Sequence, residues 1–108
     1  MNGAKVESSA ADGSMRIIVS GEIDLANAAA VEDEIRDAVS GPPAAVSVDL
    51  TAVTYLDSAG VRILFALASR LQALRVMLEL VVPLDSPTRR LIELSGFESL
   101  VALRPASH

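Results

Sequence analysis

The pattern of apolar and polar residues near the start of the chain predicts a β-hairpin. Met15–Ser20 is rich in β-branched residues, which favour strands. Lys5–Ser9, just before it, is expected to form a shorter strand. Between the two lies Asp12-Gly13, a pair that favours two-residue hairpin turns. We expect Gly21–Asp24 to leave the hairpin as a loop.

The next segment has the repeat of an amphipathic helix. Ala26–Val39 is predicted to be helical because apolar residues recur every three or four positions. The core-facing positions are Val31, Ile35, Ala38 and Val39. On the polar side, Glu32 and Arg36 are spaced to form an ion pair along the helix. Gly41–Pro43 is expected to end the helix.

A buried strand and a second helix are predicted in the middle of the chain. Ala45–Leu50 has the apolar content of a core strand, and Val53–Ser58 is expected to be the loop after it. Asp57-Ser58 then opens a helix that extends to about Leu74. Its predicted core stripe is Val61, Leu64, Phe65, Ala68 and Leu71.

One more strand and one more helix are predicted towards the end of the chain. Val76–Val82 is nearly continuous in apolar residues, which is typical of a buried strand. Ser86 suits an N-cap, Pro87 suits the first helical position, and Gly96 suits the position just after the helix. The expected core stripe of this helix is Leu91, Ile92 and Leu94.

Strands and helices that alternate in this way predict an α/β fold, with a small, mixed, mostly parallel β-sheet and helices packed against it. The 108 residues are enough for one core, and we expect residues 1–108 to form one domain. Sites in such sheets lie beyond the carboxyl ends of the strands. Asp24 and Ser58 will therefore lie close together if the strands before them are neighbours.

The composition narrows the chemistry that the chain can perform. There is no cysteine, which excludes disulfides and thiolate sites, and the only histidine is the terminal His108. We therefore expect no catalytic site and no metal site. A net charge of −5 argues against nucleic-acid binding, which needs a basic face. Charges interrupt the longest apolar stretch, so we expect no membrane insertion. The absence of cysteine fits a reducing compartment, and we expect a cytoplasmic location.

The segment Asp57-Ser58-Ala59-Gly60 combines an acidic residue, a hydroxyl group and a helix start. The Asp57 carboxylate suits the N-cap, and Ser58 in the first turn should point its hydroxyl outward. A phosphate on Ser58 is expected to meet free helix N–H groups and the positive end of the helix dipole. From this pattern alone, Ser58 is explained equally well as an ordinary helix-start residue.

Three motifs in the same order resemble those of the STAS-domain anti-sigma-factor antagonists. Asp57–Gly60 is similar to the Asp-Ser-x-Gly motif of that family, and Gly21–Asp24 to its Gly-Glu-(Leu/Ile)-Asp motif. Ser86–Phe97 resembles a third signature, which is Ser-Pro, a basic helix and then Ser/Thr-Gly-Leu, here with Phe97 in place of Leu. The resemblance covers about Met15 to Leu100.

This resemblance implies a regulatory binding protein and not an enzyme. Ser58 matches the serine that an anti-sigma factor, itself an ATP-dependent serine kinase, phosphorylates in the family. The unphosphorylated antagonist binds the anti-sigma factor and so releases the sigma factor. Phosphorylation on Ser58 would switch this binding off, and a phosphatase would restore it. ATP would thus be used by the partner kinase, with no cofactor on this chain.

The resemblance also implies a set of partner-binding residues around Ser58. Asp57 matches an acidic residue that contributes to kinase recognition, and Asp24 matches a loop aspartate near the phosphoserine position. Gly60 matches the glycine of the motif. Arg62 departs from the small or apolar residue of many relatives, and we expect it to bear on partner choice.

Several of these residues also suit different roles. Asp24 fits an N-cap of the first helix, and Glu22 with Asp24 could form an acid–base pair, although no nucleophile lies nearby. A serine hydrolase is disfavoured because the chain has neither an internal histidine nor a Gly-x-Ser-x-Gly elbow. With the same fold, the chain could instead be a subunit of a lipid-transport ABC complex or a stressosome-type scaffold, although Ser58 favours the sigma pathway.

Overall fold

The computed structural model describes residues 3–41, 43–96 and 102–105. Four residues named in the sequence predictions lie outside this range: Pro42, Phe97, Leu100 and His108.

The strands form one five-stranded sheet in the order β1-β2-β3-β4-β5. β1 is antiparallel to β2, whereas β2 to β5 run parallel to one another. This confirms the predicted mixed, mostly parallel sheet. The short β5 was not predicted, because three residues carry too little pattern to identify a strand. The strand bounds are Ala4–Ala11 (β1), Ser14–Ile23 (β2), Ala45–Leu56 (β3), Met77–Val81 (β4) and Ala102–Arg104 (β5).

The predicted hairpin between β1 and β2 is confirmed. Asp12 and Gly13 both have positive φ, at 54° and 81°, and Ala11 pairs with Ser14 across the turn. Two consecutive left-handed residues give the turn the twist that hairpin strands need, which is why Asp-Gly is favoured there.

Two segments predicted as loops are in fact strand. β2 continues through Ile23 and β3 through Leu56, so the loop predictions for Gly21–Asp24 and Val53–Ser58 were wrong over most of their length. The pairing of β2 with β3 shifts register twice, once after Ile18 and once after Gly21. Such irregularities interrupt the strict alternation by which strands are recognised in a sequence.

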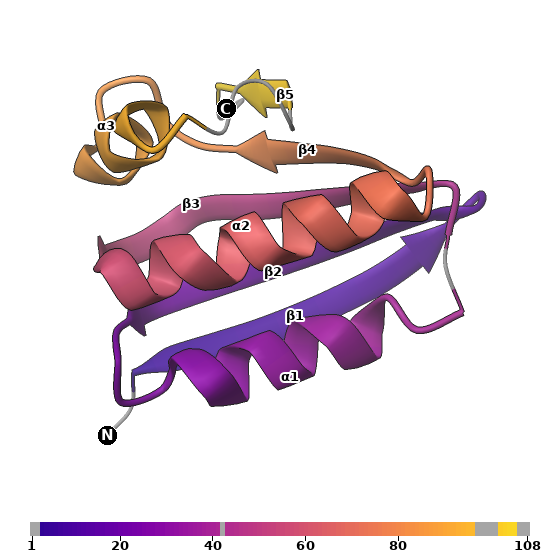
Figure 1. The fold of residues 1–108 in the computed structure, drawn as a ribbon, viewed down its shortest axis with the longest axis horizontal. Coiled ribbons are helices and arrows are strands. Elements are labelled where there is room, and N and C mark those ends of the chain that lie inside the picture. Colours follow the sequence, from indigo (N-terminus) through magenta and orange to yellow (C-terminus); the bar gives the residue numbers. More distant parts are fainter. Residues whose placement is uncertain (1–2, 42, 97–101, 106–108) are drawn as a thin grey trace.

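The described residues form three helices beside the sheet, and Figure 1 shows α1 and α2 side by side on the same face. α1 packs against β1 and β2, α2 packs against β3 and β4, and α3 contacts β3. Within the described residues, no helix has both the length and the apolar content to cross a membrane. The helix bounds are Ala28–Ala38 (α1), Ser58–Ala73 (α2) and Pro87–Leu94 (α3).

The predicted limits of α3 are confirmed by its caps. The Ser86 hydroxyl oxygen accepts a hydrogen bond from the Arg89 amide at 3.0 Å, and Pro87 is the first helical residue. Ser95 is the C-cap, and Gly96 follows it with a φ of 78°, the left-handed conformation expected after a helix end.

The core between the sheet and the helices is aliphatic, but two residues predicted to lie in it are exposed. Phe65 of α2 is 46% exposed and Leu94 of α3 is 79% exposed. In α2 the buried positions include Ile63 and Leu67, which were not predicted. Ile63 and Leu67 are buried because α1 packs along that side of α2. The apolar pattern of one helix does not show which neighbouring element will cover each side of it.

The face of the sheet opposite to α1 and α2 is polar. Arg16 of β2 and Asp49 of β3 form an ion pair across the strands at 3.0 Å, and Arg104 of β5 pairs with Glu79 of β4 at 3.1 Å. These residues alternate along their strands with the buried residues of the core. One face of the sheet is therefore buried under the helices, and the other faces solvent.

Candidate functional site

The candidate site lies where β2 and β3 end side by side. Ile23 and Leu56, the last residues of the two strands, are paired, and the Asp57 amide donates to the Ile23 carbonyl at 3.2 Å. α1 and α2 both begin at this edge, on the left in Figure 1. The condition set for Asp24 and Ser58 to lie close together is met, because β2 and β3 are neighbours and both residues follow their paired ends.

Asp57 is the N-cap of α2, as predicted, and it has a second role that was not predicted. Its Oδ1 accepts hydrogen bonds from the amides of Ala59 and Gly60, at 2.9 and 3.2 Å. Its Oδ2 accepts from the Leu25 amide at 3.2 Å. One carboxylate therefore caps the helix and also fixes the turn that follows β2.

Ser58 is the first residue of α2 and is exposed, as predicted. The expectation that a phosphate there would meet free helix N–H groups is wrong for most of the first turn. Asp57 Oδ1 already accepts from the Ala59 and Gly60 amides, and the Asp57 carbonyl accepts from the Val61 amide at 3.0 Å. A phosphate on Ser58 would instead lie beside a carboxylate with both oxygens engaged.

Asp24 organises the turn between β2 and α1. Its Oδ1 accepts from the amides of Ala26 and Asn27, at 3.0 and 3.2 Å. The N-cap of α1 is Asn27, so the alternative of Asp24 as N-cap is wrong. An acid–base role for Asp24 with Glu22 also loses support, because the Asp24 carboxylate is already used to hold the turn.

Gly60 is buried directly beneath the site. A Cβ atom added there would overlap the Leu56 side chain and approach the Ile23 Cγ2 to 3.1 Å. Glycine at this position lets α2 approach the ends of both strands closely. The structure thus gives Gly60 a packing role, while its predicted contact with a partner stays a prediction.

Arg62 lies one turn beyond Ser58 on the same helix and is exposed. Among the described residues it forms no ion pair. Its guanidinium group is therefore available to a phosphate on Ser58, since side chains four residues apart in a helix are neighbours.

Two exposed apolar residues at this edge were missed by the sequence analysis. Leu25 is 81% exposed, and its amide is bound by Asp57, the residue next to Ser58. Tyr55 of β3 is 49% exposed. The available signal was Leu25 itself, an apolar residue within a turn and outside every core stripe. Exposed apolar side chains around a polar centre are typical of a surface that binds another protein.

Comparisons with known proteins agree with this geometry. The family model for the STAS domain matches residues 5–108. The chain is 38% identical over 91 residues to the anti-sigma-F factor antagonist RsfB of Mycobacterium tuberculosis, covering 83% of this chain and 72% of the relative.

Solved structures of anti-sigma factor antagonists have the same fold as this chain. An anti-sigma factor antagonist from Mycobacterium paratuberculosis superposes with a TM-score of 0.86 and 35% identity, over 95% of this chain and 86% of the other. The antagonist SpoIIAA in its unphosphorylated form has a TM-score of 0.76 and 20% identity, over 96% and 90% of the two chains. Its phosphorylated form, from Bacillus, has a TM-score of 0.72 at the same identity, over 96% and 93%. At that identity SpoIIAA shows a shared fold, whereas the family match and the mycobacterial relatives go further: this chain belongs to the STAS-domain family of anti-sigma factor antagonists.

Proposed function

We propose that this protein is an anti-sigma factor antagonist controlled by phosphorylation on Ser58. In its unmodified form it binds a cytoplasmic anti-sigma factor and so releases a sigma factor. The anti-sigma factor acts as a serine kinase and transfers the γ-phosphoryl group of ATP to the Ser58 hydroxyl, leaving ADP and a proton. A phosphatase hydrolyses the phosphoserine and returns the protein to its binding form.

The observation that carries this proposal is the exposure of Ser58 at the first position of α2. A hydroxyl group at that place is open to a kinase, and its modification does not disturb the core. The name of RsfB, 38% identical to this chain, gives the class of partner. The existence of SpoIIAA structures with and without phosphate supports a switch that this fold tolerates.

Release by phosphorylation follows from the charges at the site. A phosphoserine adds about −1.5 to −2 charges at neutral pH. Here it would lie next to the Asp57 carboxylate and near the exposed Leu25 and Tyr55 side chains. A partner docked over these residues would have to desolvate a dianion, which costs several kcal/mol. A cost of about 4 kcal/mol weakens binding roughly a thousandfold.

The free protein has a local means of holding the same charge. Arg62 is four residues from Ser58 in α2 and can pair with the phosphate. An ion pair with Arg62 would offset the negative charge of the phosphate in the isolated protein. A bound partner would break this ion pair or remove it from solvent. Modification is therefore expected to change binding much more than it changes folding.

The test uses the kinase-type anti-sigma factor encoded in the same genome, with calorimetry and intact-mass spectrometry. We expect one phosphate, on Ser58, after incubation with ATP and Mg²⁺. Ser58→Ala should bind the anti-sigma factor and stay unmodified. Ser58→Asp, with a single negative charge, should fold normally and bind at least about a hundredfold more weakly.

Circular dichroism of each variant separates a loss of binding from a loss of folding. Phosphate on Ser86 or Ser95 with Ser58 unmodified would refute the assigned acceptor. Tight binding by a well-folded Ser58→Asp protein, or by the phosphoprotein, would refute electrostatic release.

The exposed leucine beside the switch provides an independent prediction. Leu25→Ser should weaken binding of the anti-sigma factor by at least about fivefold, because a central apolar contact is worth more than about 1 kcal/mol. Leu94→Ser on α3 is a matched control, since the two side chains are 81% and 79% exposed. Neither change should alter the melting temperature noticeably. Equal affinities for the two variants would place the interface elsewhere.

A further inference from the structure

A groove runs between α1 and α2, separate from the Ser58 site. Its volume is about 170 Å³. Its walls are apolar where the helices meet, with Ile35 on α1 and Ile63 and Leu67 on α2, while Ala66 leaves its middle open. Engineered apolar cavities of about 150 Å³ take up benzene, so the groove has room for about six carbon atoms.

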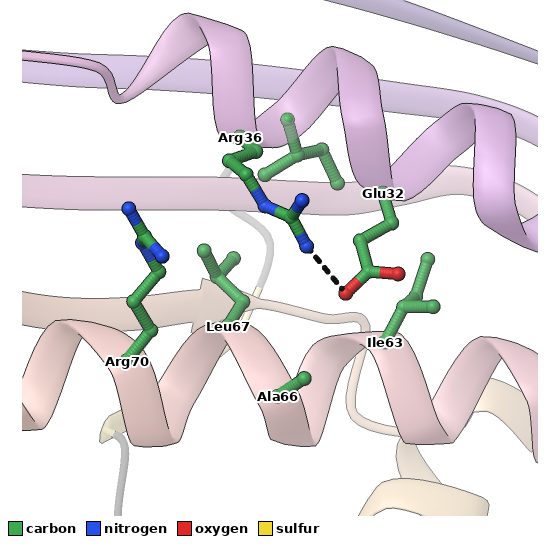
Figure 2. A pocket seen from close by; sticks show the side chains of 7 residues that line it. Glu32, Arg36, Ile63, Ala66, Leu67 and Arg70 are labelled. Atoms are coloured by element: carbon green, nitrogen blue, oxygen red, sulfur yellow. Dashed lines mark hydrogen bonds and ion pairs between the residues drawn. The ribbon is translucent and has the colours of Figure 1, made fainter.

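The rim of the groove is charged, and Figure 2 shows that the charges are unequally paired. Arg36 of α1 pairs with Glu32 at 3.2 Å and lies 3.9 Å from Asp33. Arg70 of α2 also lines the groove but forms no ion pair with any carboxylate of the described residues. In a chain of net charge −5, this rim thus presents an available guanidinium group next to an apolar wall.

We propose that this groove binds a small amphipathic anion, namely a monocarboxylic acid with an apolar body of about six carbons. The carboxylate accepts hydrogen bonds from Arg70, whose guanidinium group can bind a carboxylate through two nitrogens. The apolar body lies over Ile63, Ala66 and Leu67.

This site is independent of the phosphorylation switch. The groove lining does not include Ser58, Asp57 or Leu25, and Arg70 is about three helical turns from Ser58. A ligand there would bind the free protein whether or not Ser58 carries a phosphate. A test of ligand binding in this groove therefore does not depend on which partner binds at Ser58.

The test is a two-dimensional NMR titration of the full chain with benzoate and with hexanoate at constant ionic strength. We expect saturable shifts centred on the amides of Ala66, Leu67 and Arg70, with a Kd of the order of 1 mM for a ligand of this size. Benzyl alcohol, which has the apolar body without the charge, should bind at least about fivefold more weakly.

Three variants complete the experiment. Arg70→Gln should weaken benzoate binding about tenfold, and Ala66→Phe should abolish it by filling the groove. Arg90→Gln, at an exposed arginine of α3, is the matched control and should leave the affinity unchanged. Equal affinity in wild type and Arg70→Gln would overturn the proposal, as would non-saturating shifts spread over all exposed arginines.

Discussion

Asp57, Ser58 and Gly60 occupy neighbouring positions but serve different physical purposes. Asp57 satisfies the helix amides and the Leu25 amide, Ser58 presents its hydroxyl to solvent, and Gly60 lets α2 sit close to the strand ends. Sequence reasoning identified the N-cap and the exposed serine, because both follow from local rules for a helix start. It could not find the Leu25 contact, which joins residues brought together only by the pairing of β2 with β3.

Gly60 provides a test of close packing at the residue scale. Replacing glycine by alanine inside a helix usually stabilises it, by up to about 1 kcal/mol. At Gly60 the added methyl group would overlap Leu56 and crowd Ile23, and overpacking costs about 1–3 kcal/mol. We expect Gly60→Ala to lower the free energy of unfolding by roughly 1 kcal/mol in urea denaturation. An increase in stability would mean that α2 can shift away from the strands without cost.

At the scale of elements, local patterns predicted the order and type of most strands and helices, but not their full extent. β2 and β3 run beyond their predicted ends because their register shifts disturb the alternation of side chains. Phe65 and Leu94 were placed in the core because they are apolar and helically spaced, yet both are exposed. Whether a helical side chain is buried depends on which other elements pack against that side of the helix, and the sequence of the helix alone does not show this.

The contact between α2 and the β2–α1 turn can be separated from the cap by two substitutions. Asp57→Ala removes both functions and should cost about 0.5–2 kcal/mol from the cap alone. Asp57→Asn keeps an oxygen for the helix amides but turns an NH₂ group towards the Leu25 amide. We therefore expect the asparagine variant to be more stable than the alanine variant, by about 1 kcal/mol.

Urea denaturation of both variants, with Asp85→Asn as a control at an exposed turn, measures this difference. Equal losses for asparagine and alanine would show that the bond to Leu25, and not the cap, holds this edge together.

At the scale of the whole molecule, the sheet separates an aliphatic core from a polar surface. α1 and α2 cover one face, and the opposite face carries the ion pairs of Asp49 and Glu79. This polar face was not predicted from the sequence, because Val76–Val82 was interpreted as a buried strand from its nearly continuous apolar content. The partners across strands depend on the register of pairing. Burial alone would raise the pKa of Asp49, but hydrogen bonds from Thr51 and the adjacent Arg16 outweigh it and lower the pKa.

The lowered pKa of Asp49 predicts how stability changes with pH. A carboxylate whose pKa is lower in the folded state stabilises the protein above its unfolded pKa of about 3.9. This contribution is lost as the pH falls through the folded pKa. The difference in unfolding free energy between wild type and Asp49→Asn should therefore be constant near neutral pH and shrink in acid. Thermal melts from about pH 7 to about pH 3 test this, and a difference that does not change in acid would contradict it.

The hydrogen bond from the Leu25 amide to Asp57 also gives the protein a natural reporter. The two residues are 32 positions apart in the sequence, and the Leu25 side chain is almost fully in solvent. An amide proton in such a place would exchange quickly with water if it were not bonded. The exchange rate of this amide therefore depends on the position of the Asp57 carboxylate, which lies next to Ser58. If Ser58 is phosphorylated as proposed, we expect deuterium uptake at this one amide to change with the modification, without any label or substitution at the serine itself.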